Sequence, residues 1–157
     1  MIFETDIQMD DRCWVFQSKK MLSQKFQQEL LSQLHVFQKE WKTHGKLLKS
    51  GVKILYNHFV VVWVESAFQN ASGCSIDQMI GFFQKIDRQY HLEFFNRLNL
   101  AFEENHQIIF LTIPQAKERI KKNQFSENSY LFNNSISNGK QFIQNWKINP
   151  YQSWLNR

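Results

Sequence analysis

Apolar residues recur at helical spacing between Ser23 and Thr43. They step along the chain by four, four, three and four positions and are Phe26, Leu30, Leu34, Phe37 and Trp41. This spacing places them on one side of an amphipathic helix that packs on a sheet. Ser23 is a suitable N-cap, and His44-Gly45 closes the predicted helix near Thr43, with the glycine in the left-handed position after its last turn.

A second helical pattern follows Ser75. Its apolar side is formed by Met79, Phe82, Phe83, Ile86 and Tyr90. We predict that Ser75 is the N-cap of this helix and that Gln78, three residues later, completes a capping box. Cys74 then lies one residue outside the helix, near unpaired amides at its positive end.

Strand patterns are found over 13–17 and in two predicted β-hairpins. The first hairpin joins 52–56 to 59–64 through Asn57-His58, and its uninterrupted apolar second strand is expected to be central in a sheet and buried on both faces. The second hairpin joins 98–102 to 108–112 through a polar turn.

The C-terminal third of the chain contains signals for two shorter helices. Pro114 predicts the start of one that ends near Lys122, and Ser137 or Asn138 predicts the cap of another that runs to Trp146. The polar stretch 123–138 between them is interpreted as a loop.

The order strand, helix, strand, strand, helix, strand matches a split βαβ, or ferredoxin-like, unit. The predicted fold class is therefore α+β: a mainly antiparallel sheet packed by two long helices, an extra hairpin that extends the sheet, and a C-terminal helical extension. The 157 residues suit a single domain, in which the acidic first eleven residues are expected to be flexible.

Composition favours a globular protein, since 43% of the residues are hydrophobic and 15% are aromatic. Two cysteines are too few for a disulfide scaffold, and the N-terminus lacks the basic and apolar regions of a secretory signal, so a cytoplasmic location is expected. The longest apolar run, 59–64, is far shorter than a membrane-spanning helix, so no membrane span is expected.

The chain has a net charge of +5, and beyond the acidic first eleven residues 19 basic side chains face only 10 acidic ones. Such a balance attracts nucleic acid without sequence preference. The lysines are dispersed and the RNA-recognition signature is absent, so weak nucleic-acid binding remains only an alternative. Aromatic residues offer a stacking surface or an interface for a homodimer: Trp14, Phe16, Phe59, Trp63, Tyr151 and Trp154.

The sequence lacks the motifs that mark several large enzyme classes. The sequence contains no glycine-rich phosphate loop, so ATPase activity is not supported, and it contains no Gly-x-Gly-x-x-Gly, His-Glu-x-x-His or Gly-x-Ser-x-Gly. The five histidines are far apart in the sequence, so we predict neither a metal site nor another cofactor.

The stretch 72–77 contains the groups best suited to bind an anion. The amides from Gly73 to Asp77 and the hydroxyls of Ser72 and Ser75 would hold an anion or small ligand at a helix start. The Asp77 carboxylate opposes an anion there, because it already interacts with the helix dipole. An ordinary capped helix is the competing interpretation.

Cys74 is the candidate nucleophile, because amides at a helix start stabilise a thiolate. A cysteine enzyme also needs a base, for which only His44 or His58 is available. A packed structural cysteine is the alternative. We therefore expect a non-catalytic binding or interaction module for a protein or a small anionic ligand, with 72–77 and His44 as its cleft. A small cysteine-dependent enzyme or redox-responsive protein is the second interpretation.

Motifs along nearly the whole chain resemble those of a known group of sequences. They are Trp41-x-x-His44-Gly45, 51–59, Glu65-Ser66, 71–77, Phe94-x-x-Arg97-Leu98-Asn99 and Phe132-Asn133-Asn134. The chain resembles a small uncharacterised bacterial family of similar length, often labelled "ABC transporter ATPase", a label that the missing phosphate loop does not support. The resemblance implies no established activity and no catalytic residue. Val64 stands where the family often has an acidic residue, which weakens a paired-carboxylate site at Glu65.

Overall fold

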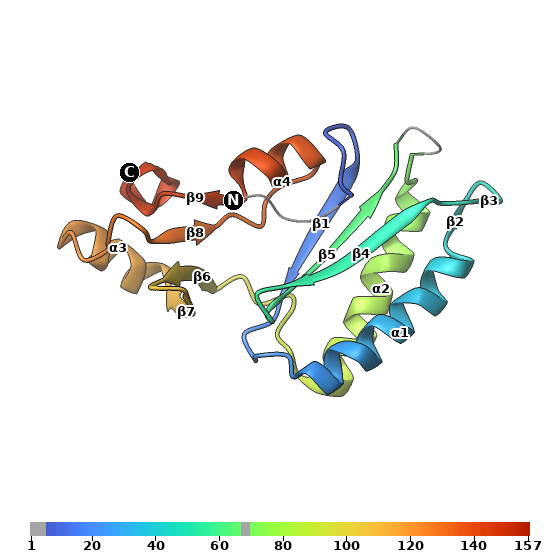
Figure 1. Ribbon diagram of the computed structural model, residues 1–157, viewed down its shortest axis with the longest axis horizontal. Helices are drawn as coiled ribbons and strands as arrows, with labels where there is room; N and C mark the ends of the chain where they lie inside the picture. The colour runs from blue at the N-terminus through green and yellow to red at the C-terminus, as the bar shows by residue number, and fades with distance from the viewer. Residues whose placement is uncertain (1–5, 67–69) are drawn as a thin grey trace.

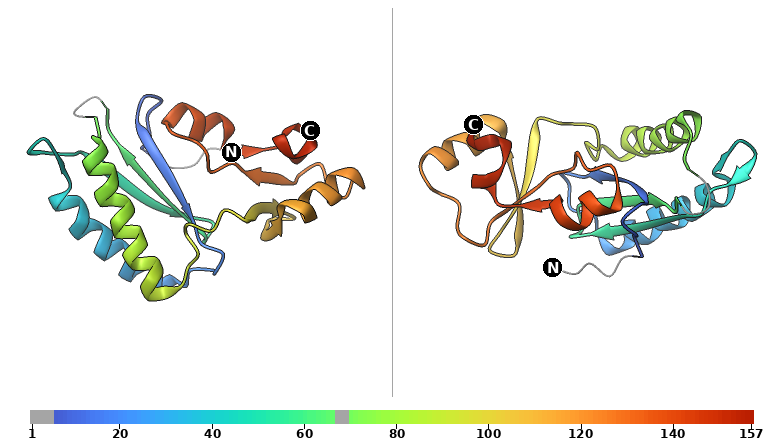
Figure 2. Two further views of the ribbon diagram at one scale, coloured as in Figure 1. Left: turned by 180° about the vertical axis from the view of Figure 1, so that it is seen from behind. Right: turned by 90° about the horizontal axis from the view of Figure 1, so that it is seen from above.

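The computed structural model describes residues 6–66 and 70–157. Two long helices, α1 (Gln24–Glu40) and α2 (Gly73–Tyr90), lie side by side on one face of a three-stranded sheet (Figure 1). This sheet contains β1 (Arg12–Gln17), β5 (Phe59–Val64) and β4 (Ser50–Leu55), in that order. A second sheet lies on the side away from the helices, as the view from behind also shows (Figure 2).

Alternate residues of β5 enter two different cores. Val60, Val62 and Val64 pack against the two helices. Phe59, Val61 and Trp63 belong to the core between the two sheets. All six residues are buried, and β5 pairs antiparallel with both neighbours. The prediction of a central strand buried on both faces is therefore confirmed.

The α+β fold class is confirmed, but a complete ferredoxin-like sheet is not formed. The strands β1, β4 and β5 have the order and directions of a split βαβ unit. A complete unit would place the strand after α2 beside β1. That strand, β6 (Asn99–Glu104), pairs instead with β7 (Gln107–Thr112) and β8 (Tyr130–Phe132). The prediction that the second hairpin extends the first sheet is wrong, and this side of β1 lacks a fourth strand.

The second sheet has the order β7-β6-β8-β9 and includes two strands that the sequence did not predict. β8 lies inside the stretch interpreted as a loop, and β9 (Lys147–Ile148) follows the last helix. Both strands are very short, so they depend on pairing with distant partners such as Phe102, which lies opposite Leu131. Such pairing leaves little periodicity in the local sequence.

One face of the second sheet is covered by α3 (Ile113–Lys121) and by short 3₁₀ turns over Pro150–Gln152 and Trp154–Asn156. α3 begins at a capping box. The Thr112 hydroxyl accepts from the backbone N–H of Gln115, and the side-chain oxygen of Gln115 accepts from the backbone N–H of Thr112. The predicted second hairpin and the helix at Pro114 are therefore confirmed.

α1 begins as predicted but ends earlier. The Ser23 hydroxyl accepts the Phe26 N–H at 3.2 Å, and the helix stops at Glu40 rather than near Thr43. The next residues form a small hairpin of β2 (Lys42–Thr43) and β3 (Lys46–Leu47). His44 and Gly45 form its two-residue turn, with φ of 50° and 76°. A glycine with positive φ suits a tight hairpin as well as a helix end, so the sequence did not distinguish them.

The last helix, α4 (Gly139–Asn145), is capped by Asn138, one of the two predicted caps. Part of the acidic N-terminal segment, expected to be flexible, packs here: Ile7 and Asp11 are buried, and the Gly139 N–H donates to the Asp11 carbonyl. A Cβ on Gly139 would collide with the carbonyl of Gln8, so only glycine fits at this crossing. Residues 1–5 of that segment lie outside the described residues.

Across residues 6–66 and 70–157, no helix combines the length and the apolar character needed to cross a membrane.

Candidate functional site

The start of α2 differs from its predicted geometry. Ser72, not Ser75, is the N-cap: its hydroxyl accepts the Ser75 N–H at 3.2 Å. Gly73 is the first helical residue, so Cys74 lies within the first turn, where it is exposed. The predicted capping box of Ser75 and Gln78 is therefore wrong. Both serines suit a cap by composition, and tertiary packing selects between them.

That packing buries Ser75 under the end of α1. Ser75 is only 1% exposed, its hydroxyl donates to the Ser72 carbonyl at 2.8 Å, and its own carbonyl accepts the Trp41 indole N–H at 2.8 Å. Both hydroxyls proposed for an anion thus already bond within the turn. Asp77 is exposed in the same part of the helix and places a carboxylate beside it. These contacts describe a well-capped helix start.

The histidines considered as bases for Cys74 lie on other elements of the fold. His44 is exposed at the tip of the β2–β3 hairpin. His58 is buried, with Nδ1 2.8 Å from the Ser18 carbonyl oxygen and its ring against Phe110. Among the described residues, no hydrogen bond joins Cys74 to either histidine. The three residues are thus not assembled into a nucleophile and base pair in this structure.

An open cleft of about 450 Å³ lies along the side of β1 that lacks a fourth strand. Its walls come from β1, from the loop after α2, from the end of β8 and from the C-terminal 3₁₀ turn. This volume is within the range of ligand sites in proteins. The departure from the ferredoxin-like order therefore leaves a concave surface at this edge of the sheet.

A chain of side-chain hydrogen bonds fixes one wall of this cleft. The Trp146 indole N–H donates to Asn134 at 2.9 Å, and the Asn134 amide donates to Gln17 Oε1 at 2.9 Å. The Gln17 amide in turn donates to the Asn99 carbonyl at 3.1 Å. These bonds connect β1 to the loop after β8 and to the start of β6, and so link two sides of the cleft.

The mouth of the cleft is aromatic and carries a single charge. Phe95 and Trp154 are each 40% exposed, which is high for such large apolar side chains. Arg97 is the only charged side chain among the described residues that line the cleft, and no acidic residue lines it. The site therefore combines aromatic surface with uncharged polar side chains and one cationic group.

The cleft also exposes part of the edge of β1. The Cys13 N–H donates to the Ser137 carbonyl at 3.2 Å, outside the sheet, so alternate residues of β1 direct their backbone groups away from β5. By this alternation the N–H and C=O of Val15, which lines the cleft, also face outward. On this edge the Cys13 N–H is already hydrogen-bonded, whereas the main-chain groups of Val15 face the cleft.

The sequence anticipated only part of this site. Of the six aromatics proposed as a surface, Trp14, Phe16 and Trp154 line the cleft, but Phe16 is buried and stacked on Phe83 with ring centroids 3.7 Å apart. Phe59 and Trp63 are buried between the sheets. Arg97 and the asparagines were missed as site residues, although they belong to the motifs that carry the resemblance, because the cleft assembles from segments far apart in the sequence.

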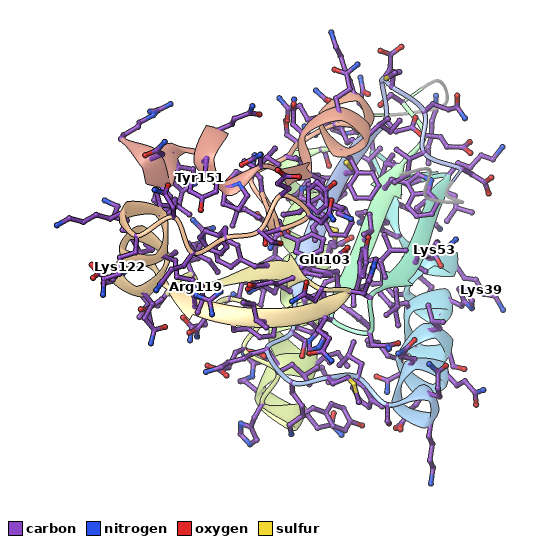
Figure 3. All side chains as sticks on the ribbon, turned by 60° about the vertical axis from the view of Figure 1, so that its left-hand side comes forward. Lys39, Lys53, Glu103, Arg119, Lys122 and Tyr151 are labelled. Carbon is purple, nitrogen blue, oxygen red and sulfur yellow. The ribbon has the colours of Figure 1, made fainter. Side chains whose placement is uncertain are left out.

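A buried charged cluster is the second group that the sequence did not reveal. Lys147 Nζ lies 3.1 Å from Glu103 Oε2 and donates to the Tyr56 hydroxyl at 3.0 Å, and it lies 4.6 Å from the ring centroid of Tyr130. Figure 3 labels Glu103 where the two sheets meet. Burial and the Glu103 carboxylate raise the pKa of Tyr56. These groups satisfy one another, and none of them lines the cleft.

Among the described residues, no three His, Cys, Asp or Glu side chains come together in a group that could hold a metal ion.

Comparison of the chain with protein-family models, curated proteins and solved structures gave no significant match in any of the three. The functional argument therefore depends on the geometry of the site.

Proposed function

We propose that this protein is a non-catalytic interaction module that binds an extended peptide segment of a partner protein along the free edge of β1. The observation that carries the proposal is the cleft at the position of the missing fourth strand, with the outward backbone of Val15 inside it. An extended peptide can add to such an edge through main-chain hydrogen bonds, while pockets beside the strand select its side chains.

The lining chemistry supports a peptide with apolar side chains and one acidic group. Phe95 and Trp154 offer aromatic surface to apolar side chains. Arg97 offers a guanidinium to a carboxylate, either an acidic side chain or a C-terminus, and planar guanidinium groups bind carboxylates through two parallel hydrogen bonds. The net charge of +5 also favours an acidic partner.

A cytoplasmic location belongs to the same proposal. Cys13 and Cys74 are both free, one buried and one exposed, as is common for proteins of reducing compartments.

The test begins with a phage-displayed library of random linear peptides panned against the full chain. We expect an enriched family with alternating apolar residues and an acidic side chain or free C-terminus. The best peptide is then synthesised, and its affinity is measured by calorimetry. Failure to enrich any peptide family would contradict the proposal.

A matched pair of variants locates the binding edge. Proline is tolerated in a sheet where the lost N–H faces away from the neighbouring strand. Val15→Pro should therefore keep the fold and weaken the peptide at least about tenfold, because it removes an outward main-chain donor and adds a ring. Val52→Pro makes the same change on the opposite edge: the Glu65 N–H donates to the Lys49 carbonyl, so by alternation Val52 faces outward too. Its peptide affinity should be unchanged.

Arg97→Gln should reduce the preference for an acidic peptide and the salt dependence of binding, whereas the exposed Arg88 on α2 provides the control variant Arg88→Gln. If Val15→Pro and Val52→Pro bind the peptide equally well, strand addition at β1 is wrong. Circular dichroism of each variant separates a lost site from a lost fold.

A further inference from the structure

β7 forms an outer edge of the second sheet and lacks the features that normally prevent edge strands from pairing. Its sequence, Gln-Ile-Ile-Phe-Leu-Thr, contains no charge, proline or glycine. Residues 108–112 are all partly exposed. In Figure 1, β7 lies on the far side of β6 from β8. Long uncharged edge strands are templates for pairing with another chain.

Each of the other sheet edges carries a protecting feature over at least part of its length. β4 carries Lys53 in its middle, labelled in Figure 3. β1 is bridged at Arg12 to Asn138. β9 contains only two residues. A central lysine, a covering segment and a very short strand are known devices against edge pairing. Within the described residues, β7 is the edge to which none of them applies.

The hairpin geometry determines which backbone groups of β7 are free. The turn residues Asn105 and His106 have φ of 51° and 63°, as in a type I′ turn, whose flanking residues form a hydrogen-bonded pair. Gln107, Ile109 and Leu111 therefore bond to β6, and Ile108 and Phe110 face outward. The outward N–H of Thr112 is already bound to Gln115 Oε1 at 2.9 Å.

We propose that a second copy of this chain pairs antiparallel with β7 across a two-fold axis, forming a homodimer with one continuous sheet. Pairing of outward residues allows Ile108 to exchange two hydrogen bonds with the partner's Phe110, and Phe110 with the partner's Ile108. Ile109 then lies opposite the partner's Ile109 at the axis. If the axis passed through Phe110 instead, Ile108 would have to pair with the partner's Thr112, whose N–H is already hydrogen-bonded to Gln115.

A second copy fits this edge better than a charged partner does. Every residue placed in the paired region is uncharged, so the two identical strands meet without like-charge repulsion. A two-fold arrangement is also the commonest symmetry of homo-oligomers. This surface is separate from the edge of β1, so the inference does not rest on the proposed peptide site.

A cysteine at the axis tests both the pairing and its register. Residues facing each other in a non-hydrogen-bonded antiparallel pair have Cα atoms about 4.5 Å apart, close enough for a disulfide. In a Cys74→Ser background, Ile109→Cys should form a disulfide-linked dimer under mild oxidation, while buried Cys13 stays reduced. Val52→Cys, on the lysine-bearing edge, is the matched control and should remain mostly monomeric.

Light scattering of the unmodified chain should show a mass that rises toward the dimer with concentration. Ile109→Lys and Ile109→Glu should each be monomeric, and mixing them should restore the dimer, which a variant that fails to fold cannot do. A monomeric wild-type chain at all concentrations, or equal disulfide formation by Ile109→Cys and Val52→Cys, would overturn the proposal.

Discussion

Replacing Lys147 with methionine removes a buried positive charge while keeping a side chain of similar length. The side chains of Lys147 and Glu103 are only 10% and 9% exposed, and their charged atoms are 3.1 Å apart. Lys147→Met leaves the Glu103 carboxylate in the interior without this cation and removes one hydrogen-bond donor from the Tyr56 hydroxyl. Water has little access to either group, so the loss is not compensated by solvation.

The expected cost is about 3 kcal/mol, the lower end of what is found when one partner of a buried ion pair is removed. For a chain of this size that corresponds to a fall of roughly 6–12 °C in Tm. Replacing both partners, as in Glu103→Leu with Lys147→Met, should recover most of the loss, because no isolated charge then remains buried.

The exposed pair of Lys122 and Glu118 on α3 is the control. Its charged atoms are 2.9 Å apart, but the side chains are 58% and 54% exposed. Lys122→Met should therefore cost no more than about 0.5 kcal/mol. The measurement is urea unfolding followed by tryptophan fluorescence and circular dichroism. Equal costs for the two lysine variants, or a double variant as unstable as the sum of both singles, would refute the reasoning.

Two further predictions concern the cores. Burial, with a contribution from the Asp11 carboxylate, raises the pKa of Cys13 from 9.0 to about 12. The folded pKa is therefore above the unfolded one, so this contribution to stability is complete below pH 9 and is lost as the pH rises toward 12. Between these pH values the free energy of unfolding, measured with urea, should fall less steeply with pH for Cys13→Ala than for the wild type. Equal slopes would contradict the assignment. Gly139→Ala should destabilise the fold by about 1–3 kcal/mol through overpacking. Gly81→Ala, within α2 and with open space at its Cβ position, should stabilise the fold by up to about 1 kcal/mol in the same assay. Similar effects at both glycines would count against the close contact of Gly139 with Gln8.

Elements with strong local signals were predicted well. Ser23, Pro114 and Asn138 all mark helix starts in the structure, since capping depends on residues only three positions apart. Both long hairpins were also predicted, because alternation and turn residues are contained in one short stretch.

Elements that depend on distant partners were not predicted. β8 exists through its pairing with β6, and the choice of Ser72 over Ser75 as cap follows from burial of Ser75 beside Trp41. The candidate site shows the same limit: the anion and thiol hypotheses came from one local segment, whereas the cleft joins six separate ones.

The amino-acid pattern alone established the α+β class, the two long helices, the central strand and the helix caps at Ser23 and Asn138, because these depend on propensity and periodicity within a few turns of chain. The tertiary structure decided that β6 leaves the first sheet, that an open cleft remains beside β1, and that Lys147 reaches Glu103. Which strand pairs with which edge depends on packing between segments far apart in the chain, and short-range patterns contain little information about that choice.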